Sequence, residues 1–513
     1  MMLFARRMAA SRSSLPIVSR GMAGVPLTKI VATIGPVSED AETLPKVTQA
    51  GMQVMRLNFS HATDEEVVLR LSSLSNTTGM FPLDGASGML RTVLLDTKGP
   101  EIRTGNLQAV KDSGDVKAKI QVKTGAEMLL TNDPAFKECS DASTMFVTYA
   151  TLEKTCTVGK TVLLDDGAIA LTVKDVSSKG VLCSVENDGE IASRRGVNLP
   201  GMAVDLPAMS DLDKEHIRYG VEKDVDFVAA SFVRKASDVE EIRAHVATCH
   251  AEFWPLSRPQ AKIIAKVEST EALENLDEIT DASDGIMVAR GDLGVEVPLE
   301  EVVIWQKEMV QRCEASGKPV IVATQMLESM QKNPRPTRAE VSDVTNAVLD
   351  GADAVMLSGE SANGKFPVES VAMMNKIIAK TEEWMPTIAN LDAMVDQAES
   401  NEDATAASAV FTSEKLGAGC IVLNGDVTGD VARLVSKYRP SAPVLLLLDG
   451  AEHADKVARQ TSLHRGVFPT LLPKQEALAA AKEQGLFSAG DDLVTITVGA
   501  SGGGIDMGIE KAA

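Results

Sequence analysis

Eight apolar segments that end in polar residues set the strongest limit on how this chain can fold. They alternate with stretches of helical pattern, clearest at residues 299–316, where Gly317 follows as a helix C-cap would. Near-continuous apolar strands between helices predict a parallel sheet that is covered on both faces. Eight such units favour a (β/α)8 barrel over an open sheet, with the chemistry at the carboxyl ends of the strands. The expected strands are residues 29–35, 53–60, 92–98, 227–233, 262–268, 285–290, 319–324 and 354–359.

Two regions depart from this series. Residues 104–199 contain short strand-like stretches between turn residues, which predict a small β domain inserted in a barrel loop. Gly and Pro at 98–100 and 199–201 fit hinges, so the insert is either a moving lid over the barrel or a static addition. Strand and helix patterns from about residue 383 predict a separate α/β domain. We therefore expect a barrel over 25–103 and 200–382, a β lid over 104–199, and a C-terminal α/β domain over 383–513.

The first 24 residues differ from everything after them, because they carry four arginines and no acidic residue. This composition is typical of an organelle transit peptide, and the alternative is a disordered basic tail on a cytosolic enzyme. We expect cleavage between about residues 15 and 27. The corresponding location is the mitochondrion or a plastid, with the cytoplasm as the alternative.

Composition excludes several other classes. The net charge of −21 argues against a nucleic-acid partner, because no basic stripe is present to release counterions. No apolar run reaches the length of a membrane span. The six cysteines contain no C-x-x-C pair and are typical of reduced thiols in a non-secreted protein.

Charged residues stand where a barrel core is expected. Lys266 and Glu268 are two residues apart in an apolar strand, which places both side chains on one face. Such charges cost several kcal/mol unless they are paired. Asp292 follows the next strand, on an expected Gly-flanked turn. One lysine and two carboxylates at successive strand ends predict a cationic anchor beside a divalent-metal site, in an enzyme that acts on phosphate. The alternative is a structural ion pair.

The motifs resemble those of the pyruvate kinase family over essentially the whole chain after residue 25. Their order along about 300 residues makes the resemblance specific. The matching stretches are residues 29–36, 55–61, 96–105, 198–201, 263–268, 287–294, 323–330 and 336–343.

The resemblance implies phosphoryl transfer from phosphoenolpyruvate to ADP, giving pyruvate and ATP. Glu268 and Asp292 would ligate Mg²⁺ or Mn²⁺, which suits hard oxygen ligands and few protein donors. Lys266 would stabilise the charge on the transferring phosphoryl group, which Arg56 would also grip. Arg103 would touch transferred phosphate or nucleotide, since a guanidinium matches phosphate oxygens.

Further roles follow from the same resemblance. Thr324 would relay a proton toward the enolate carbon, since a threonine hydroxyl is a poor acid by itself. Gly291 would offer its backbone N–H to the substrate carboxylate. The residues implied in nucleotide binding are Asn58, Phe59, Ser60, His61, Arg103 and Arg195, the last standing where many family members have lysine.

A monovalent-cation site is also implied, with oxygen donors suited to K⁺. Glu101 sharpens this expectation, because family members that need K⁺ tend to carry glutamate there, whereas independent ones carry lysine. The implied ligands are Asn58, Ser60, Asp96 and Thr97.

The C-terminal domain departs from the family pattern. The loop over 423–433 has one hydroxyl and adds Asp426 and Asp430, which repel a phosphate unless Arg433 or a metal offsets them. We expect weak or no activation by fructose bisphosphates. The resemblance implies a homotetramer. Two alternatives are a metal-dependent aldolase or lyase, which would not need the lid or the K⁺ ligands, and a non-catalytic member, which normally lacks one of the charged residues retained here.

Overall fold

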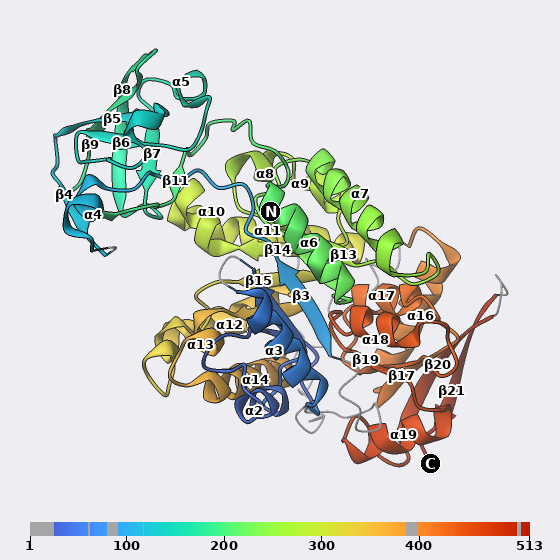
Figure 1. The fold of residues 1–513 in the computed structure, drawn as a ribbon. Coiled ribbons are helices and arrows are strands. Elements are labelled where there is room, and N and C mark those ends of the chain that lie inside the picture. The colour runs from blue at the N-terminus through green and yellow to red at the C-terminus, as the bar shows by residue number, and fades with distance from the viewer. Residues whose placement is uncertain (1–24, 60–61, 80–90, 116, 386–397, 500–503) are drawn as a thin grey trace, which may run out of the picture.

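The computed structural model describes residues 25–59, 62–79, 91–115, 117–385, 398–499 and 504–513 (Figure 1). The expected transit peptide lies outside the described residues. Within them, no helix is long and apolar enough to cross a membrane.

Eight parallel strands close into a barrel in the order β1-β16-β15-β14-β13-β12-β3-β2, which confirms the predicted (β/α)8 class. Every expected strand is present, and most end one to three residues earlier than expected because the polar end residues leave the ladder. The strands are β1 (Lys29–Thr33), β2 (Val54–Asn58), β3 (Thr92–Asp96), β12 (Phe227–Ala230), β13 (Lys262–Val267), β14 (Gly285–Ala289), β15 (Val320–Ala323) and β16 (Ala354–Leu357).

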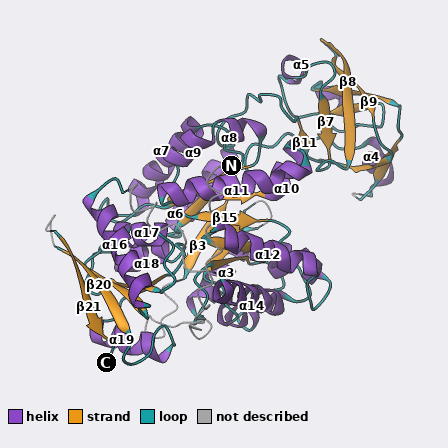
Figure 2. Ribbon diagram, turned by 180° about the vertical axis from the view of Figure 1, so that it is seen from behind, coloured by secondary structure: helices purple, strands orange, loops and turns teal. Residues whose placement is uncertain are grey.

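Helices surround the barrel, as Figure 2 shows from behind. The predicted helix over 299–316 is present with those bounds and ends at Gly317 in the left-handed conformation. The helices are α2 (Thr43–Gln49), α3 (Asp64–Ser75), α6 (Asp211–Glu222), α7 (Ala236–Phe253), α8 (Thr270–Glu274), α9 (Leu276–Ala282), α10 (Arg290–Glu296), α11 (Leu299–Ser316), α12 (Arg338–Asp350), α13 (Gly359–Ala362) and α14 (Pro367–Trp384), with a 3-10 turn, η4 (Glu328–Gln331).

The inserted domain folds its strands into a six-stranded sheet, β11-β7-β8-β9-β5-β6, and a two-stranded sheet, β10-β4. It lies on the opposite side of the barrel from the C-terminal domain (Figures 1 and 2). Its elements are α4 (Gln108–Ser113), β4 (Lys119–Val122), β5 (Glu127–Thr131), η3 (Pro134–Phe136), β6 (Thr144–Phe146), α5 (Leu152–Thr155), β7 (Thr161–Leu164), β8 (Ile169–Ser177), β9 (Gly180–Val185), β10 (Gly189–Ala192) and β11 (Val197–Asn198).

The C-terminal domain has a five-stranded sheet in the order β19-β18-β17-β20-β21, in which β21 is antiparallel. The helix over 430–437 begins at Asp430, because Gly429 before it has φ +82°. Its elements are α16 (Asn401–Leu416), β17 (Cys420–Asn424), α17 (Asp430–Lys437), β18 (Val444–Leu447), α18 (Ala454–Thr461), β19 (Val467–Thr470), α19 (Lys474–Glu483), β20 (Asp492–Val498) and β21 (Ile505–Lys511).

Aspartates recur at the amino ends of the barrel strands, here called the floor; the carboxyl ends are called the mouth. Asp226, Asp284 and Asp353 directly precede β12, β14 and β16. Each carboxylate accepts the backbone N–H at the start of a neighbouring strand, so it ties two strands together at the floor. The donors are, in that order, Val93 (2.8 Å), Ile263 (2.7 Å) and Val320 (3.1 Å).

The C-terminal domain closes this floor. Arg439 donates two hydrogen bonds to Asp353, at 2.6 and 2.8 Å, and Arg459 donates one to Asp226 at 2.9 Å. The fully buried Leu463 belongs to the hydrophobic cluster that fills the barrel interior. The domain therefore seals one end of the barrel and leaves the mouth as the end available for chemistry.

Candidate active site

Four side chains from three strands meet at the mouth around a buried lysine. Lys266 Nζ lies 2.9 Å from Glu268 Oε1 and 3.2 Å from Asp96 Oδ1, and it donates a hydrogen bond to Ser231 Oγ at 2.6 Å. The pair at a spacing of two thus shares one face of the chain, as predicted. Burial disfavours the ammonium, but Asp96 and Glu268 outweigh it and raise the pKa of Lys266 above its usual value. Lys266 is therefore a fixed positive charge.

A second cation lies beside it. Arg56, on β2, donates from Nε to Asp96 Oδ2 at 2.7 Å and from Nη1 to Thr33 Oγ1 at 2.9 Å. Asp96 is buried, which favours its neutral form, but Arg56 and Lys266 hold the pKa of this carboxyl below its ordinary value. The single carboxylate thus orients both cations toward the mouth.

Glu268 and Asp292 lack such compensation. Glu268 Oε2 accepts the Phe232 N–H at 2.5 Å, but Oε1 accepts no hydrogen bond of good geometry from the described residues. Burial, with a contribution from Asp292, raises the pKa of Glu268 to about 7. Burial likewise raises the pKa of Asp292. A buried carboxylate, that of Glu268, beside the half-buried Asp292 forms a site that a cation would stabilise.

The donor set fits Mg²⁺ or Mn²⁺. Hard cations of this kind bind through one or two carboxylates and complete their shell with water and substrate oxygens. The described part of the chain contains no group of three or more His, Cys, Asp or Glu that could hold a metal. Glu268 and Asp292 would therefore supply the protein ligands and leave the other positions open.

The expected turn at Asp292 is wrong in detail. Residues 290–296 form the helix α10, and Asp292 lies in its first turn. Gly291 lies against Thr324, since a Cβ at this glycine would meet Thr324 Cγ2 at 2.9 Å. The two residues implied in substrate contact are therefore neighbours, and no larger side chain fits at position 291.

Thr324 follows β15 in an unusual conformation. Its φ is +76° and that of Gln325 is +57°. A β-branched residue is a rare occupant of this region, and such strain gathers at functional sites. The backbone thus identifies Thr324 independently of any motif.

Two of the residues implied as K⁺ ligands lie on two paired strands. Asn58 on β2 is in register with Asp96 on β3, and Thr97 follows directly. Ser60 and His61 lie outside the described residues. The Phe59 ring is buried, and its centroid lies 5.0 Å from that of the His216 ring. Only the backbone of Phe59 is therefore left to contact a nucleotide.

Two arginines lie at the connections between the lid and the barrel. Arg103 donates to Glu101 Oε2 at 2.6 Å and to the Arg194 carbonyl at 2.8 Å. Arg195 lies 3.6 Å from Asp165 of the β7–β8 turn. Arg103 is the last residue of the barrel segment at the entry hinge and Arg195 belongs to the lid, so both would reach a ligand from the side of the inserted domain.

The lid also contacts the helix that carries Asp292. Asn198 donates to Glu296 Oε1 of α10 at 3.1 Å. The entry hinge is held by a hydrogen bond from the Gly99 N–H to Asp213 Oδ1 at 3.1 Å. These contacts place the inserted domain beside the mouth.

Sequence reasoning gave no role to three residues that complete the site. Ser231 bridges Lys266 and Asp96, the Phe232 N–H binds Glu268, and Thr33 holds Arg56. The signal was present for Ser231, since the apolar segment 227–233 carries one polar residue near its end. A backbone N–H such as that of Phe232 leaves no signal in a sequence.

The loop in the C-terminal domain carries its own anion. Asp426 is buried and accepts hydrogen bonds from the N–H groups of Gly429 (3.0 Å) and Ala432 (2.8 Å) at the start of α17. Those donors would otherwise be available to a phosphate. The carboxylate therefore occupies the position where an anion would bind.

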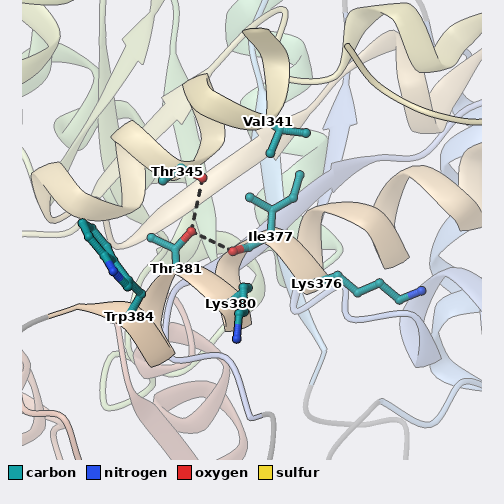
Figure 3. A pocket seen from close by; sticks show the side chains of 7 residues that line it. All are labelled: Val341, Thr345, Lys376, Ile377, Lys380, Thr381 and Trp384. Carbon is teal, nitrogen blue, oxygen red and sulfur yellow. Dashed lines mark hydrogen bonds between the residues drawn. The ribbon is translucent and has the colours of Figure 1, made fainter. Parts of the chain in front are cut away.

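A separate cavity between α12 and α14 is shown in Figure 3. Its lining is mostly apolar, and the hydroxyls of Thr345 and Thr381 are bonded to each other at 3.3 Å. Lys380 at its rim pairs with Glu383 at 2.9 Å, a residue that does not line the cavity. The charged residues of the mouth, and not this cavity, carry the features of an active site.

Comparison with known proteins shows what this chain is similar to. The family models "Pyruvate kinase, barrel domain" and "Pyruvate kinase, alpha/beta domain" match residues 25–371 and 403–507. Pyruvate kinase PKLR of Homo sapiens is 42% identical over 491 residues, covering 92% of this chain and 82% of the relative. The pyruvate kinase of Bacillus licheniformis is 42% identical over 486 residues (93% and 78%), and that of Schizosaccharomyces pombe 41% over 473 residues (91% and 86%).

Proposed function

This chain belongs to the pyruvate kinase family, and we propose that the side chains of its barrel mouth carry phosphoryl transfer from phosphoenolpyruvate to ADP. The observation that supports these residues most is the buried Lys266 held between Asp96 and Glu268, beside Arg56. Two fixed cations next to two carboxylates whose pKa values burial raises suit a phosphate and a divalent cation at one place.

Lys266 and Arg56 act on the transferring group. Charge spreads over the phosphoryl oxygens as the group moves, and preformed donors in a buried site stabilise that charge without reorganising. Asp96 holds both cations in place and prevents their mutual repulsion from turning them apart. Glu268 and Asp292 would hold Mg²⁺ or Mn²⁺, which neutralises charge on the carboxylate and phosphate oxygens of the substrate.

Thr324 and Gly291 serve the other half of the reaction. The Gly291 N–H would bind the substrate carboxylate and fix the orientation of the three-carbon unit. The Thr324 hydroxyl would pass a proton, through water, to the carbon that becomes the methyl group of pyruvate.

K⁺ would bind at the paired ends of β2 and β3. Asn58 and Asp96, which are in register, and Thr97 would supply oxygens there. Ser60, the fourth proposed ligand, lies outside the described residues. The Glu101 carboxylate accepts from Arg103 and lies 3.8 Å from Lys98 Nζ, and a negative side chain rather than a lysine at position 101 supports a need for K⁺.

ADP would bind between the mouth and the lid. Arg103 and Arg195 would approach its phosphates from the side of the lid, and residues 58–61 from the barrel. Movement of the lid over residues 104–199 would exclude water during transfer. We also propose that the barrel covers residues 25–103 and 200–382 and that the C-terminal domain covers residues 383–513.

The assembly and location belong to the same proposal. We expect a homotetramer and a transit peptide that is removed on import. Val25 and Leu27 are buried in the core of the C-terminal domain, and the Leu27 carbonyl accepts the Gly466 N–H at 2.8 Å. Cleavage should therefore fall before Val25, which narrows the expected window. An intact N-terminus on the native protein would favour a cytoplasmic enzyme.

The first test is ATP formation from phosphoenolpyruvate and ADP with Mg²⁺, run in K⁺ and in Tris. Turnover only with K⁺ would support both the reaction and the cation site. Turnover in both would keep the reaction and remove the K⁺ requirement. A folded, processed protein without turnover in either would contradict the proposed roles of the mouth residues.

A further inference from the structure

Arg290 joins the two segments that carry the proposed substrate contacts. It is the first residue of α10, next to Gly291, but the reaction described above gives its side chain no task. Its Nε donates to the carbonyl oxygen of Ala323 at 3.0 Å, and its Nη2 donates to that of Thr324 at 2.6 Å. The guanidinium therefore grips the backbone at the point where β15 ends and the strained turn begins.

The same guanidinium is anchored from its other side. Asp343 on α12 accepts from Nη1 at 2.7 Å and from Nη2 at 2.8 Å, which is the bidentate geometry. Gln306 on α11 accepts from Nη1 at 3.3 Å. These contacts occupy the donors of the guanidinium and leave none directed at a substrate. Arg290 is thus built into the scaffold and does not point into the mouth.

The hydrogen bonds from Arg290 to the carbonyls of Ala323 and Thr324 hold a backbone segment that would relax without them. Thr324 and Gln325 both have positive φ, a strained conformation that persists only where the surrounding structure imposes it. The methyl group of Thr324 packs on Gly291, so the backbone conformation decides where its hydroxyl points. Release of the two carbonyls would let the turn relax and move that hydroxyl.

We propose that Arg290, anchored by Asp343, is a positioning residue that holds the Thr324 hydroxyl against the carbon that is protonated. The inference rests on the proposed function. In that step the enolate gains one proton on its methylene carbon and its oxygen becomes the keto oxygen of pyruvate. The Thr324 hydroxyl gives up one proton and regains one from water. Phosphoryl transfer, which depends on Lys266 and Arg56, does not pass through this contact.

The test uses the variant Arg290→Lys, which keeps the positive charge but loses the planar, forked set of N–H donors. Protonation and the complete reaction are measured separately in this variant. Exchange of the methyl hydrogens of pyruvate with deuterated water, followed by NMR with ATP and Mg²⁺ present, reports on protonation. ATP formation from phosphoenolpyruvate reports on the complete reaction. We expect exchange to fall about 10- to 100-fold, and KM for phosphoenolpyruvate to stay within about twofold.

A matched control exists at the amino end of β14, the strand whose carboxyl end directly precedes Arg290. Arg243 also joins a carboxylate and a carbonyl, those of Asp284 and Ala282, each at 2.8 Å, where β14 begins. Arg243→Lys should leave both rates unchanged. Asp343→Asn weakens the anchor of Arg290 but keeps the arginine itself. It should therefore lower the exchange rate by a smaller factor than Arg290→Lys does. This variant serves if Arg290→Lys does not fold.

A double-mutant cycle decides whether Arg290 acts through Thr324. In a Thr324→Ala background, Arg290→Lys should cost little further exchange. Equal and additive losses in that background, or a KM effect without loss of exchange, would overturn the inference. Absence of ATP formation by the unmodified enzyme would instead overturn the proposed function, so the two failures are distinguishable.

Discussion

At the floor of the barrel, Asp353 is buried and Arg439 holds it from both carboxylate oxygens; this interaction outweighs burial and keeps the pKa of Asp353 below its usual value. At the mouth, Glu268 is equally buried, but its Oε1 accepts no good hydrogen bond from the described residues, and burial raises its pKa to about 7. Asp353 at the floor and Glu268 at the mouth thus differ in their partners, whereas Asp96 at the mouth is paired as Asp353 is.

This difference distinguishes the charges that stabilise the fold from the charges that are available to a ligand. A buried charge with a complete set of partners supports the structure, and removal of one partner costs several kcal/mol. A buried charge with an incomplete set costs stability and is kept where function needs it. Changes at the mouth should therefore alter catalysis, whereas changes at the floor should alter stability.

Lys266→Met should give the largest effect. The reaction should slow at least about 1,000-fold, because a preformed charge on the phosphoryl group is lost, while substrate and metal binding persist in part. Initial rates of pyruvate formation measure this loss.

Lys29→Met is the matched control for that change. Lys29 is equally buried, at the floor, where its Nζ donates to the Val467 carbonyl at 2.8 Å. The Lys29→Met variant should form pyruvate at a rate within about threefold of that of the unmodified enzyme. Equal losses in the two variants would show that the ends do not differ.

Arg439→Met tests the floor. It leaves Asp353 buried without its main partner and should lower stability by about 3–5 kcal/mol, while the folded fraction keeps its specific activity. Urea unfolding and rate measurements on the same samples would show this. Adding Asp353→Asn should recover part of the loss. A drop in specific activity with unchanged stability would contradict the division of roles.

Acid should weaken the floor through His464. Burial, followed by repulsion from Lys262, lowers the pKa of His464 to about 3. Since the unfolded chain takes up this proton first, the stability contribution is present above the unfolded pKa and is lost as pH falls toward 3, by about 2 kcal/mol at pH 5. His464→Gln should flatten this part of the profile in thermal unfolding. An unchanged profile would assign the pH dependence to other groups.

The proposed K⁺ requirement concerns one charge at the mouth. Activity in K⁺ should exceed that in Tris by about tenfold or more, and Glu101→Lys should reduce the ratio to about two, since one well-placed charge is worth roughly 1.4 kcal/mol. Glu101→Gln removes the carboxylate without adding an ammonium and should keep the requirement. Relaxation by both variants would point to release of Arg103, which Glu101 now holds.

The smallest effect is expected from a sugar bisphosphate. Fructose bisphosphate should change half-saturation by phosphoenolpyruvate less than about twofold, because Asp426 already occupies the N–H groups at the start of α17. Activation of several-fold would show that the ligand displaces this carboxylate or binds elsewhere.

Much of the barrel could be predicted because its signal is local. An apolar strand with polar residues at its end appears in the sequence, and the spacing of Lys266 and Glu268 fixes a common face. The motifs then supplied roles that spacing alone left open. Asp96 was predicted only as a K⁺ ligand, although it also holds Lys266 and Arg56.

The remainder depends on contacts that no local pattern records. A single aspartate before a strand, such as Asp353, is typical of a loop until its partner on another domain is known. The helix α10 contains two glycines in seven residues, so propensity favoured a turn over the helix that packing imposes. The antiparallel strand β21 was not predicted because its partner, β20, defines it.

The contact between Lys29 and Val467 spans 438 residues of sequence. A ribosome that adds about 5–20 residues per second needs on the order of 20 to 90 s to cover this distance. Through that interval the first strand has been made, but the segment that buries its lysine has not. Early barrel segments must therefore wait for the last domain, and chaperones have that time in which to hold them.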